Sequence, residues 1–257
     1  FMGKELTYKE LYESALKFAN YLQILGVEKG DRIAVMLPNC PQAVIAYYGI
    51  LYAGGIVVQT NPLYTERELQ YQMADSGAKI ILGLDILYPR ITKILKETQI
   101  ENVIITGIKD YLPFPKNLVY PFIQKKQYGF SVKVEHSGMN HLFVEIMRSA
   151  PLKEITVPFD FEEDLALLQY TGGTTGFPKG VMLTHKNLIA NTMMCDAWLY
   201  KCEDGQEIVL GILPFFHVYG MTTVLIMSVM KKSKMVLMPK FDVEDTLKTI
   251  DKQKPTL

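Results

Sequence analysis

Short apolar runs alternate with helix-length segments between residues 32 and 105, and this alternation constrains the fold more than any other feature. The runs at 32–37, 56–59, 79–82 and 102–105 are too short for helices, so they predict buried strands. The segments between them begin near Pro41, Thr65 and Ile86 and have the length of helices. Strands that alternate with helices in this way predict an α/β fold, with mainly parallel sheets flanked by helices.

The same reading extends to both ends of the chain. Thr7 and Glu10 form a capping box at the start of a helix that ends at Gly26. Further strands are predicted at 165–169, 181–184, 207–213 and 235–238, and helices at 187–199 and after Asp242. Regularity fades between 107 and 163, where five prolines break the pattern, so we interpret this stretch as an irregular insertion.

Composition excludes several classes of protein. The 27 basic and 27 acidic residues balance, so a nucleic-acid partner is not expected. Three scattered cysteines argue against a disulfide framework and favour a reducing, cytoplasmic compartment. The apolar stretch 211–230 contains a proline, a histidine and three hydroxyl residues, which favours a strand end, a loop and a helix over a membrane span.

The segment Thr171–Gly180 carries the chemistry. It contains four glycines, three threonines and one lysine, and a predicted strand lies on each side. Glycines allow backbone amides to approach an anion closely, while threonine hydroxyls and Lys179 add donors and a positive charge. We therefore predict a polyphosphate-binding loop, and the alternative is a glycine-rich surface turn.

Two familiar phosphate loops do not fit this segment. A Walker A loop has glycine before its lysine and serine or threonine after it, whereas Pro178 and Gly180 flank Lys179. The dinucleotide-binding pattern GxGxxG is also absent.

Tyr170–Gly180 resembles the phosphate-loop signature of the adenylate-forming superfamily, which includes acyl-CoA synthetases, luciferases and peptide-synthetase adenylation domains. The segments 6–11, 52–62 and 213–220 resemble other motifs of that superfamily in the same order. The combination is most similar to bacterial long-chain fatty acid–CoA ligases. The resemblance implies a two-step reaction: fatty acid and ATP, with Mg²⁺, give acyl-adenylate and pyrophosphate, and coenzyme A then displaces AMP.

The resemblance also implies roles for individual residues. The matching loop holds the β- and γ-phosphates of ATP, and it comprises Thr171, Gly172, Gly173, Thr174, Thr175, Gly176 and Lys179. Thr171 would be the hydroxyl linked to Mg²⁺, while Gly172 replaces a hydroxyl residue found in many members. His217 would lie near the reacting carboxylate as the catalytic histidine, and Tyr219 would line the acyl pocket. The alternatives are a hydrogen-bonded core histidine and a tyrosine that only packs.

The resemblance implies that later motifs follow residue 257. The adenine, ribose and Mg²⁺ motifs and a small C-terminal domain would all lie there, so the chain is expected to be an inactive N-terminal fragment. We expect one subdomain at 31–195, and part of a second at 1–30 plus 196–257. Unpaired strand edges would favour a homodimer. A long-chain substrate is found in or near a bilayer, so peripheral contact of the protein with the inner face of the membrane stays an open alternative.

Three other functions remain open at this stage. One is adenylation of an aryl or amino acid, and another is nucleotide binding without catalysis. The third is a structural α/β domain, which leaves the threonine-rich loop unexplained.

Overall fold

The computed structural model describes residues 1–129, 132, 134, 137–172 and 177–257. The strands of the first sheet are β1 (Arg32–Met36), β2 (Ile56–Gln59), β3 (Ile80–Leu84), β4 (Asn102–Thr106), β5 (Asn140–Leu142), β6 (Leu165–Thr171) and β7 (Lys179–Thr184). The second sheet has β8 (Ile208–Gly211) and β9 (Lys234–Leu237). The helices are α1 (Tyr8–Ile24), α2 (Pro41–Tyr52), α3 (Glu66–Ser76), α4 (Tyr88–Ile94), α5 (Lys116–Tyr128), α6 (Phe143–Ser149), α7 (His185–Trp198), α8 (Val218–Gly220), α9 (Met227–Met230) and α10 (Val243–Gln253). Short helical turns occur at η1 (Asp85–Leu87), η2 (Leu95–Glu97), η3 (Ile108–Tyr111) and η4 (Met221–Ile226).

The first sheet is parallel except at one edge. In the described part of the chain its order is β5-β4-β3-β1-β2-β6-β7, and only β7 runs antiparallel, beside β6. The α/β fold with mainly parallel strands predicted from the sequence is therefore confirmed. Successive strands are added on opposite sides of β1, so the strand order reverses there. Ligands of open α/β sheets bind at the carboxyl ends of the strands beside such a reversal.

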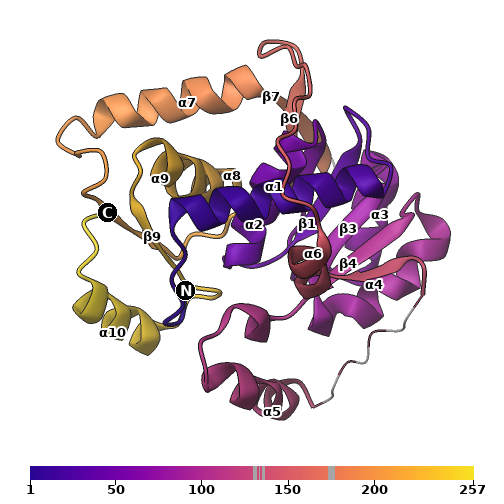
Figure 1. The fold of residues 1–257 in the computed structure, drawn as a ribbon, viewed down its shortest axis with the longest axis horizontal. Helices are drawn as coiled ribbons and strands as arrows, with labels where there is room; N and C mark the ends of the chain where they lie inside the picture. The colour runs from indigo at the N-terminus through magenta and orange to yellow at the C-terminus, as the bar shows by residue number, and fades with distance from the viewer. Residues whose placement is uncertain (130–131, 133, 135–136, 173–176) are drawn as a thin grey trace.

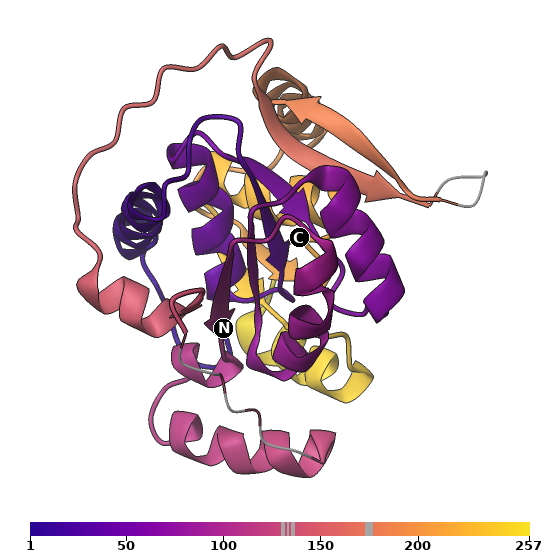
Figure 2. The same ribbon diagram turned by 90° about the vertical axis from the view of Figure 1, so that its right-hand side faces the viewer.

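Helices cover both faces of this sheet (Figures 1 and 2). Helices α1, α2 and α6 pack together on one face, while α3 and α4 pack together on the other. Because both faces are covered, the central strands β1, β2 and β3 are almost wholly buried. The capping box predicted at Thr7 is present, Thr65 and Glu68 form a second one at the start of α3, and Pro41 occupies the first turn of α2.

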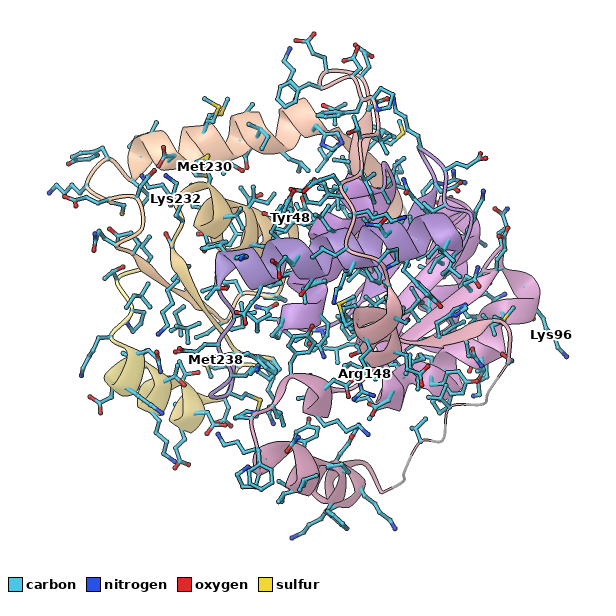
Figure 3. The ribbon with its side chains drawn as sticks, viewed as in Figure 1. Tyr48, Lys96, Arg148, Met230, Lys232 and Met238 are labelled. Atoms are coloured by element: carbon cyan, nitrogen blue, oxygen red, sulfur yellow. The ribbon has the colours of Figure 1, made fainter. Side chains whose placement is uncertain are left out.

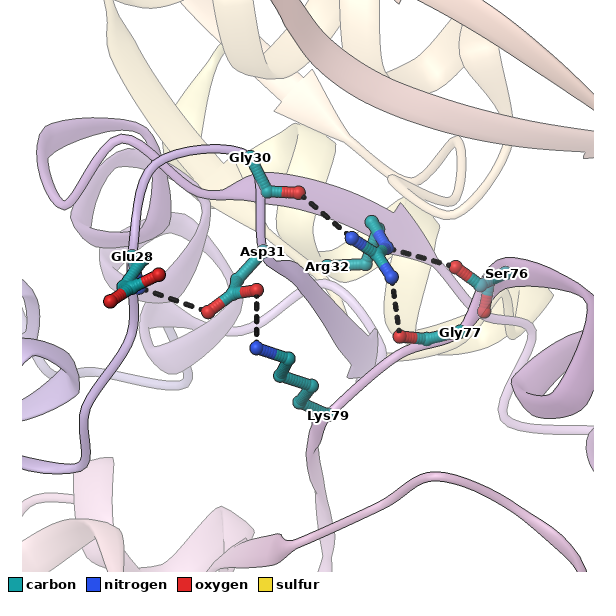
Figure 4. Close-up of polar contacts among 7 residues, drawn as sticks. All are labelled: Glu28, Gly30, Asp31, Arg32, Ser76, Gly77 and Lys79. Carbon is teal, nitrogen blue, oxygen red and sulfur yellow. Dashed lines mark hydrogen bonds and ion pairs between the residues drawn. The ribbon is translucent and has the colours of Figure 1, made fainter.

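A group of polar contacts ties β1 to the start of β3 (Figure 4). The Asp31 carboxylate accepts a hydrogen bond from the Glu28 amide and forms an ion pair with Lys79 at 2.7 Å. Arg32 donates to the carbonyl oxygens of Ser76 and Gly77 from the other side of the strand. These contacts align the amino-terminal ends of neighbouring strands and leave their carboxyl ends free for a site.

The second sheet packs beside the first and is joined to it by buried polar contacts. The strands β8 and β9 are parallel, and the Thr256 and Leu257 amides and the Leu257 carbonyl continue the pairing along β8. The Tyr8 hydroxyl at the start of α1 donates to the carbonyl oxygens of Ser228 and Ser233. The helix α1 therefore packs on the first sheet layer along its length and contacts the second at its beginning.

The interpretation of 107–163 as irregular was only partly right. The prolines do interrupt the chain, but α5, β5 and α6 lie within this stretch, and β5 extends the sheet beside β4. The apolar stretch after β8 forms the short helices α8 and α9 on either side of η4. Among the described residues, no helix is both long enough and apolar enough to cross a membrane.

Candidate functional site

The predicted phosphate loop connects the two strands of a hairpin. Thr171 ends β6 and lies opposite Lys179, the first residue of β7, so both strand ends of the loop are held by antiparallel pairing. Figure 2 shows this two-stranded ribbon extending from the body of the molecule. Thr171, Gly172 and Lys179 are exposed, and Lys179 forms no ion pair with any described carboxylate. Gly173, Thr174, Thr175 and Gly176 lie outside the described residues.

Helix α3 anchors both arms of the hairpin. The Tyr71 hydroxyl donates to the Pro178 carbonyl oxygen at 3.1 Å, and its ring lies 5.4 Å from that of Phe177. On the other arm, the Tyr170 hydroxyl donates to Asp75 at 2.6 Å. Burial, together with the Asp75 carboxylate, raises the pKa of Tyr170, so this hydroxyl remains a donor at neutral pH. The loop therefore starts and ends at positions set by one helix.

Gly180 has a packing reason to be glycine. A Cβ atom at this position would stand 3.1 Å from the Tyr170 ring across the hairpin. The two strands approach closely where they enter the loop, which leaves no room for a side chain between them.

His217 lies on a short segment between β8 and α8, and its imidazole is exposed. Its Nδ1 accepts a hydrogen bond from the Tyr219 amide at 3.3 Å, which caps α8. The alternative of a core histidine is therefore wrong for this structure, and Tyr219 is also exposed. Both side chains are accessible to a ligand.

A buried amide brings the His217 segment to the strand that leads into the phosphate loop. The Gln169 side chain in β6 donates to the Phe216 carbonyl oxygen at 3.1 Å. Gln169 directly precedes Tyr170, and Phe216 directly precedes His217, so this contact lies one residue away from each of them. The structure thus joins the two regions that the sequence analysis selected separately.

Asn39, which the sequence analysis missed, makes a second such connection. Its amide nitrogen donates to the carbonyl oxygens of Gly211 and Leu213, and its oxygen accepts from the Phe215 amide at 2.9 Å. The side chain is only 2% exposed and follows the carboxyl end of β1. An asparagine two residues before a helix reads as an ordinary turn residue, so the sequence carries no signal of this role.

A large cavity lies beside this site and not within it. Its volume is about 1440 Å³, and Asn39, Pro214 and Phe216 line one side of it. Thr171, Gly172 and Lys179 do not line it. The described residues contain no group of three histidine, cysteine or acidic side chains that could hold a metal ion.

Comparison with known proteins agrees with this geometry. A family model described as "AMP-binding enzyme" matches residues 1–257. The chain belongs to the AMP-binding, adenylate-forming enzyme family. A long-chain-fatty-acid–CoA ligase of Bacillus subtilis is 54% identical over 258 residues, covering all of this chain and 46% of that protein. The ligase of the same description from Salmonella typhimurium is 40% identical, covering 86% of this chain and 40% of its own.

Solved structures of this family share the fold. A long-chain-fatty-acid–CoA ligase from Archaeoglobus fulgidus superimposes with a TM-score of 0.78 at 28% identity, over 98% of this chain and 44% of that one. ATP-bound MatB from Rhodopseudomonas palustris gives a TM-score of 0.74 at 26% identity, over 95% and 42%. The chain spans less than half the length of each of these four relatives, so it corresponds to a part of them.

Proposed function

We propose that these residues supply the ATP phosphate-binding part of a long-chain fatty acid–CoA ligase. The single observation that carries the proposal is the hairpin that holds the segment 171–180: Lys179 at its end forms no ion pair with a described carboxylate, and Gln169 at its base contacts Phe216, the residue before His217. The Bacillus subtilis relative, 54% identical, supports the choice of a long-chain fatty acid as the acyl substrate. The products would be acyl-CoA, AMP and pyrophosphate.

In this proposal the protein positions charge more than it forms bonds. Backbone amides of the loop, the Thr171 hydroxyl and the Lys179 ammonium hold the β- and γ-phosphates, which aligns the α-phosphate for attack by a carboxylate. His217 lies beside the attacking carboxylate and Tyr219 contacts the acyl chain. Coenzyme A then enters as the second acceptor.

Mg²⁺ would arrive with the nucleotide. It is bound in such enzymes by few protein oxygens and by phosphates, and Thr171 is the hydroxyl that we assign to it. The exposed position of Thr171 at the entrance of the loop is compatible with this role.

We also propose that residues 31–195 form one subdomain and that residues 1–30 with 196–257 form part of a second. The packing of α1 on α2 and α6 weighs against placing residues 1–30 in the second, and the Tyr8 contacts with Ser228 and Ser233 support it. We further propose that the 257 residues bind nucleotide without turnover, since they correspond to less than half of the relatives. Two strand edges, on β7 and on the second sheet, are candidates for self-association as a homodimer.

A chimera tests the proposed activity. These 257 residues are joined to the remaining sequence of the Bacillus subtilis ligase, and CoA-thioester formation is assayed with fatty, aryl and amino acids. We expect activity with long-chain fatty acids, which Lys179→Ala lowers about 10- to 100-fold through loss of a charged phosphate contact. Lys96→Ala, at another exposed lysine, is the matched control.

His217→Ala in the same chimera should lower kcat more than it raises KM for ATP, because the histidine acts beside the reacting carboxylate. Thioester formation that is unaffected by both Lys179→Ala and His217→Ala would refute the assigned site. Preference of the chimera for aryl or amino acids would favour the alternative substrate class.

The polypeptide by itself should bind ATP weakly in calorimetry, with lower affinity in Lys179→Ala. Its fatty-acid-dependent pyrophosphate exchange should stay at background, and clear exchange would overturn the proposal of binding without turnover.

A further inference from the structure

Helix α5 lies at the periphery of the molecule (Figures 1 and 2), and several of its apolar side chains are exposed to solvent. Phe114, just before the helix, is 78% exposed, and Phe122 is 76% exposed. The exposed apolar side chains of this region, which we call the α5 face, are Phe114, Leu118, Val119, Phe122 and Ile123. This is the reverse of an ordinary surface helix, whose apolar side faces the core.

The opposite side of α5 is polar and holds the helix to the protein. Lys116 donates to the Met2 carbonyl oxygen at 3.0 Å, and Gln124 donates to Asp85 at 2.8 Å. Lys116, Tyr120 and Gln124 are spaced four residues apart, so they share one side of the helix, and all three line the large cavity. The orientation of the α5 face toward solvent is therefore fixed by contacts on the other side.

The charged residues of the α5 segment itself are all lysines. Lys125 and Lys126 are exposed in the last turn of α5, and no acidic residue occurs between residues 111 and 129. The chain as a whole is neutral, so this segment is a local departure from its average. Apolar side chains flanked by lysines complement a surface that is apolar inside and anionic outside.

We propose that the α5 face docks onto an anionic lipid bilayer. Phe122 and Leu118 enter the boundary between headgroups and acyl chains, while Lys125 and Lys126 lie at the level of the lipid phosphates. A lipid surface fits better than a protein partner because lysine is depleted in protein interfaces, whereas interfacial membrane helices combine lysines with phenylalanine and leucine. The proposal does not depend on the acyl-CoA ligase activity.

The structure sets the size of the expected effects. Each lysine near an anionic surface contributes about fivefold to binding, so Lys125→Gln with Lys126→Gln should weaken vesicle binding about 25-fold. Phe122→Ser removes a large apolar side chain that becomes buried when the protein binds, so it should weaken vesicle binding by about tenfold or more. Raising the salt concentration should weaken binding by screening the lysines, but should have little effect on the double lysine variant.

Vesicle co-sedimentation of the 257-residue protein tests the proposal. Vesicles of phosphatidylcholine with phosphatidylglycerol should bind the protein, and vesicles of phosphatidylcholine alone should bind it much less. Lys96→Gln with Lys201→Gln is the charge-matched control, since both lysines are exposed and outside α5; Lys96 is labelled in Figure 3. Trp198→Ser on α7, at a side chain that is 85% exposed, is the apolar control. Equal loss of binding in the control variants would overturn the proposal.

A single-tryptophan variant tests which face touches the lipid. Trp198 is the only tryptophan, so Trp198→Phe with Phe122→Trp carries one reporter, on α5. Lipids brominated in their acyl chains should quench its fluorescence when the vesicles are anionic. Bound protein whose tryptophan is not quenched would refute the docking face. Absence of vesicle binding, with a dimer that Phe122→Ser dissociates, would instead identify a second copy of the chain as the occupant and overturn the lipid proposal.

Discussion

Asn39 should contribute about 3 kcal/mol to stability, far more than an ordinary asparagine. Asn39→Ala removes three hydrogen bonds, at 3.0, 2.8 and 2.9 Å, which join the end of β1 to the segment 211–215. At about 1 kcal/mol for each buried bond, the free energy of unfolding should fall by about 3 kcal/mol. For a chain of this size, that corresponds to a fall in Tm of roughly 6–12 °C.

Urea unfolding followed by circular dichroism measures this change. Asn61→Ala is the matched control, since Asn61 accepts one local hydrogen bond from the Leu63 amide in an exposed turn and should cost less than about 1 kcal/mol. Asn39→Asp keeps the acceptor for the Phe215 amide but points a carboxylate oxygen at two carbonyl oxygens, so it should be at least as destabilising as alanine at neutral pH. An Asn39→Ala protein within about 1 kcal/mol of the unmodified chain would refute the inference that this side chain holds the two sheets together.

Three further changes have distinct expected results. Burial raises the pKa of Asp31, but hydrogen bonds from the Glu28 amide and Lys79 outweigh it, so the pKa of this carboxyl is lowered overall. The stability that follows from the lowered pKa is present above the ordinary value of 3.8 and is lost as the pH falls below it. Asp31→Asn should therefore flatten the acid end of a profile of unfolding free energy against pH. Gly77 has φ of +61°, so Gly77→Ala should cost about 1–2 kcal/mol in urea unfolding, and an unchanged midpoint would argue against that backbone conformation. Tyr71→Phe removes one anchor of the phosphate loop and should lower stability by less than about 1 kcal/mol; ATP affinity in calorimetry should fall by up to about fivefold, and unchanged affinity would show that the anchor is not needed.

The sequence predicts the frame of the fold well because that frame depends on local patterns. Buried strands such as β1 and β3 read as apolar runs, and the cap at Thr65 needs only a neighbour three residues away. The helix α5 was missed because its exposed apolar face and internal Pro121 do not resemble an ordinary surface helix.

The candidate site was likewise predictable only where it depends on consecutive residues. The loop between β6 and β7 was visible because glycines, threonines and a lysine are consecutive. The contacts of Asn39 with residues 211–215, and of Gln169 with Phe216, join positions far apart in sequence, so no single-sequence pattern reveals them. Trp198 at the end of α7 is 85% exposed, although a lone tryptophan in an apolar helix pattern reads from sequence as a core residue.

The position of β6 beside β2 has a consequence for synthesis of the chain on the ribosome. Val57 and Val58 of β2 pair with Leu167 and Leu168 of β6, which emerge about a hundred residues later. At a synthesis rate of about 5–20 residues per second, β2 waits roughly 5–20 s for this partner, while β1 and β3 can already pair. During that interval the open edge of β2 is an apolar strand able to pair with another nascent chain, so its shielding by chaperones is expected to matter more than that of any other strand in the first sheet.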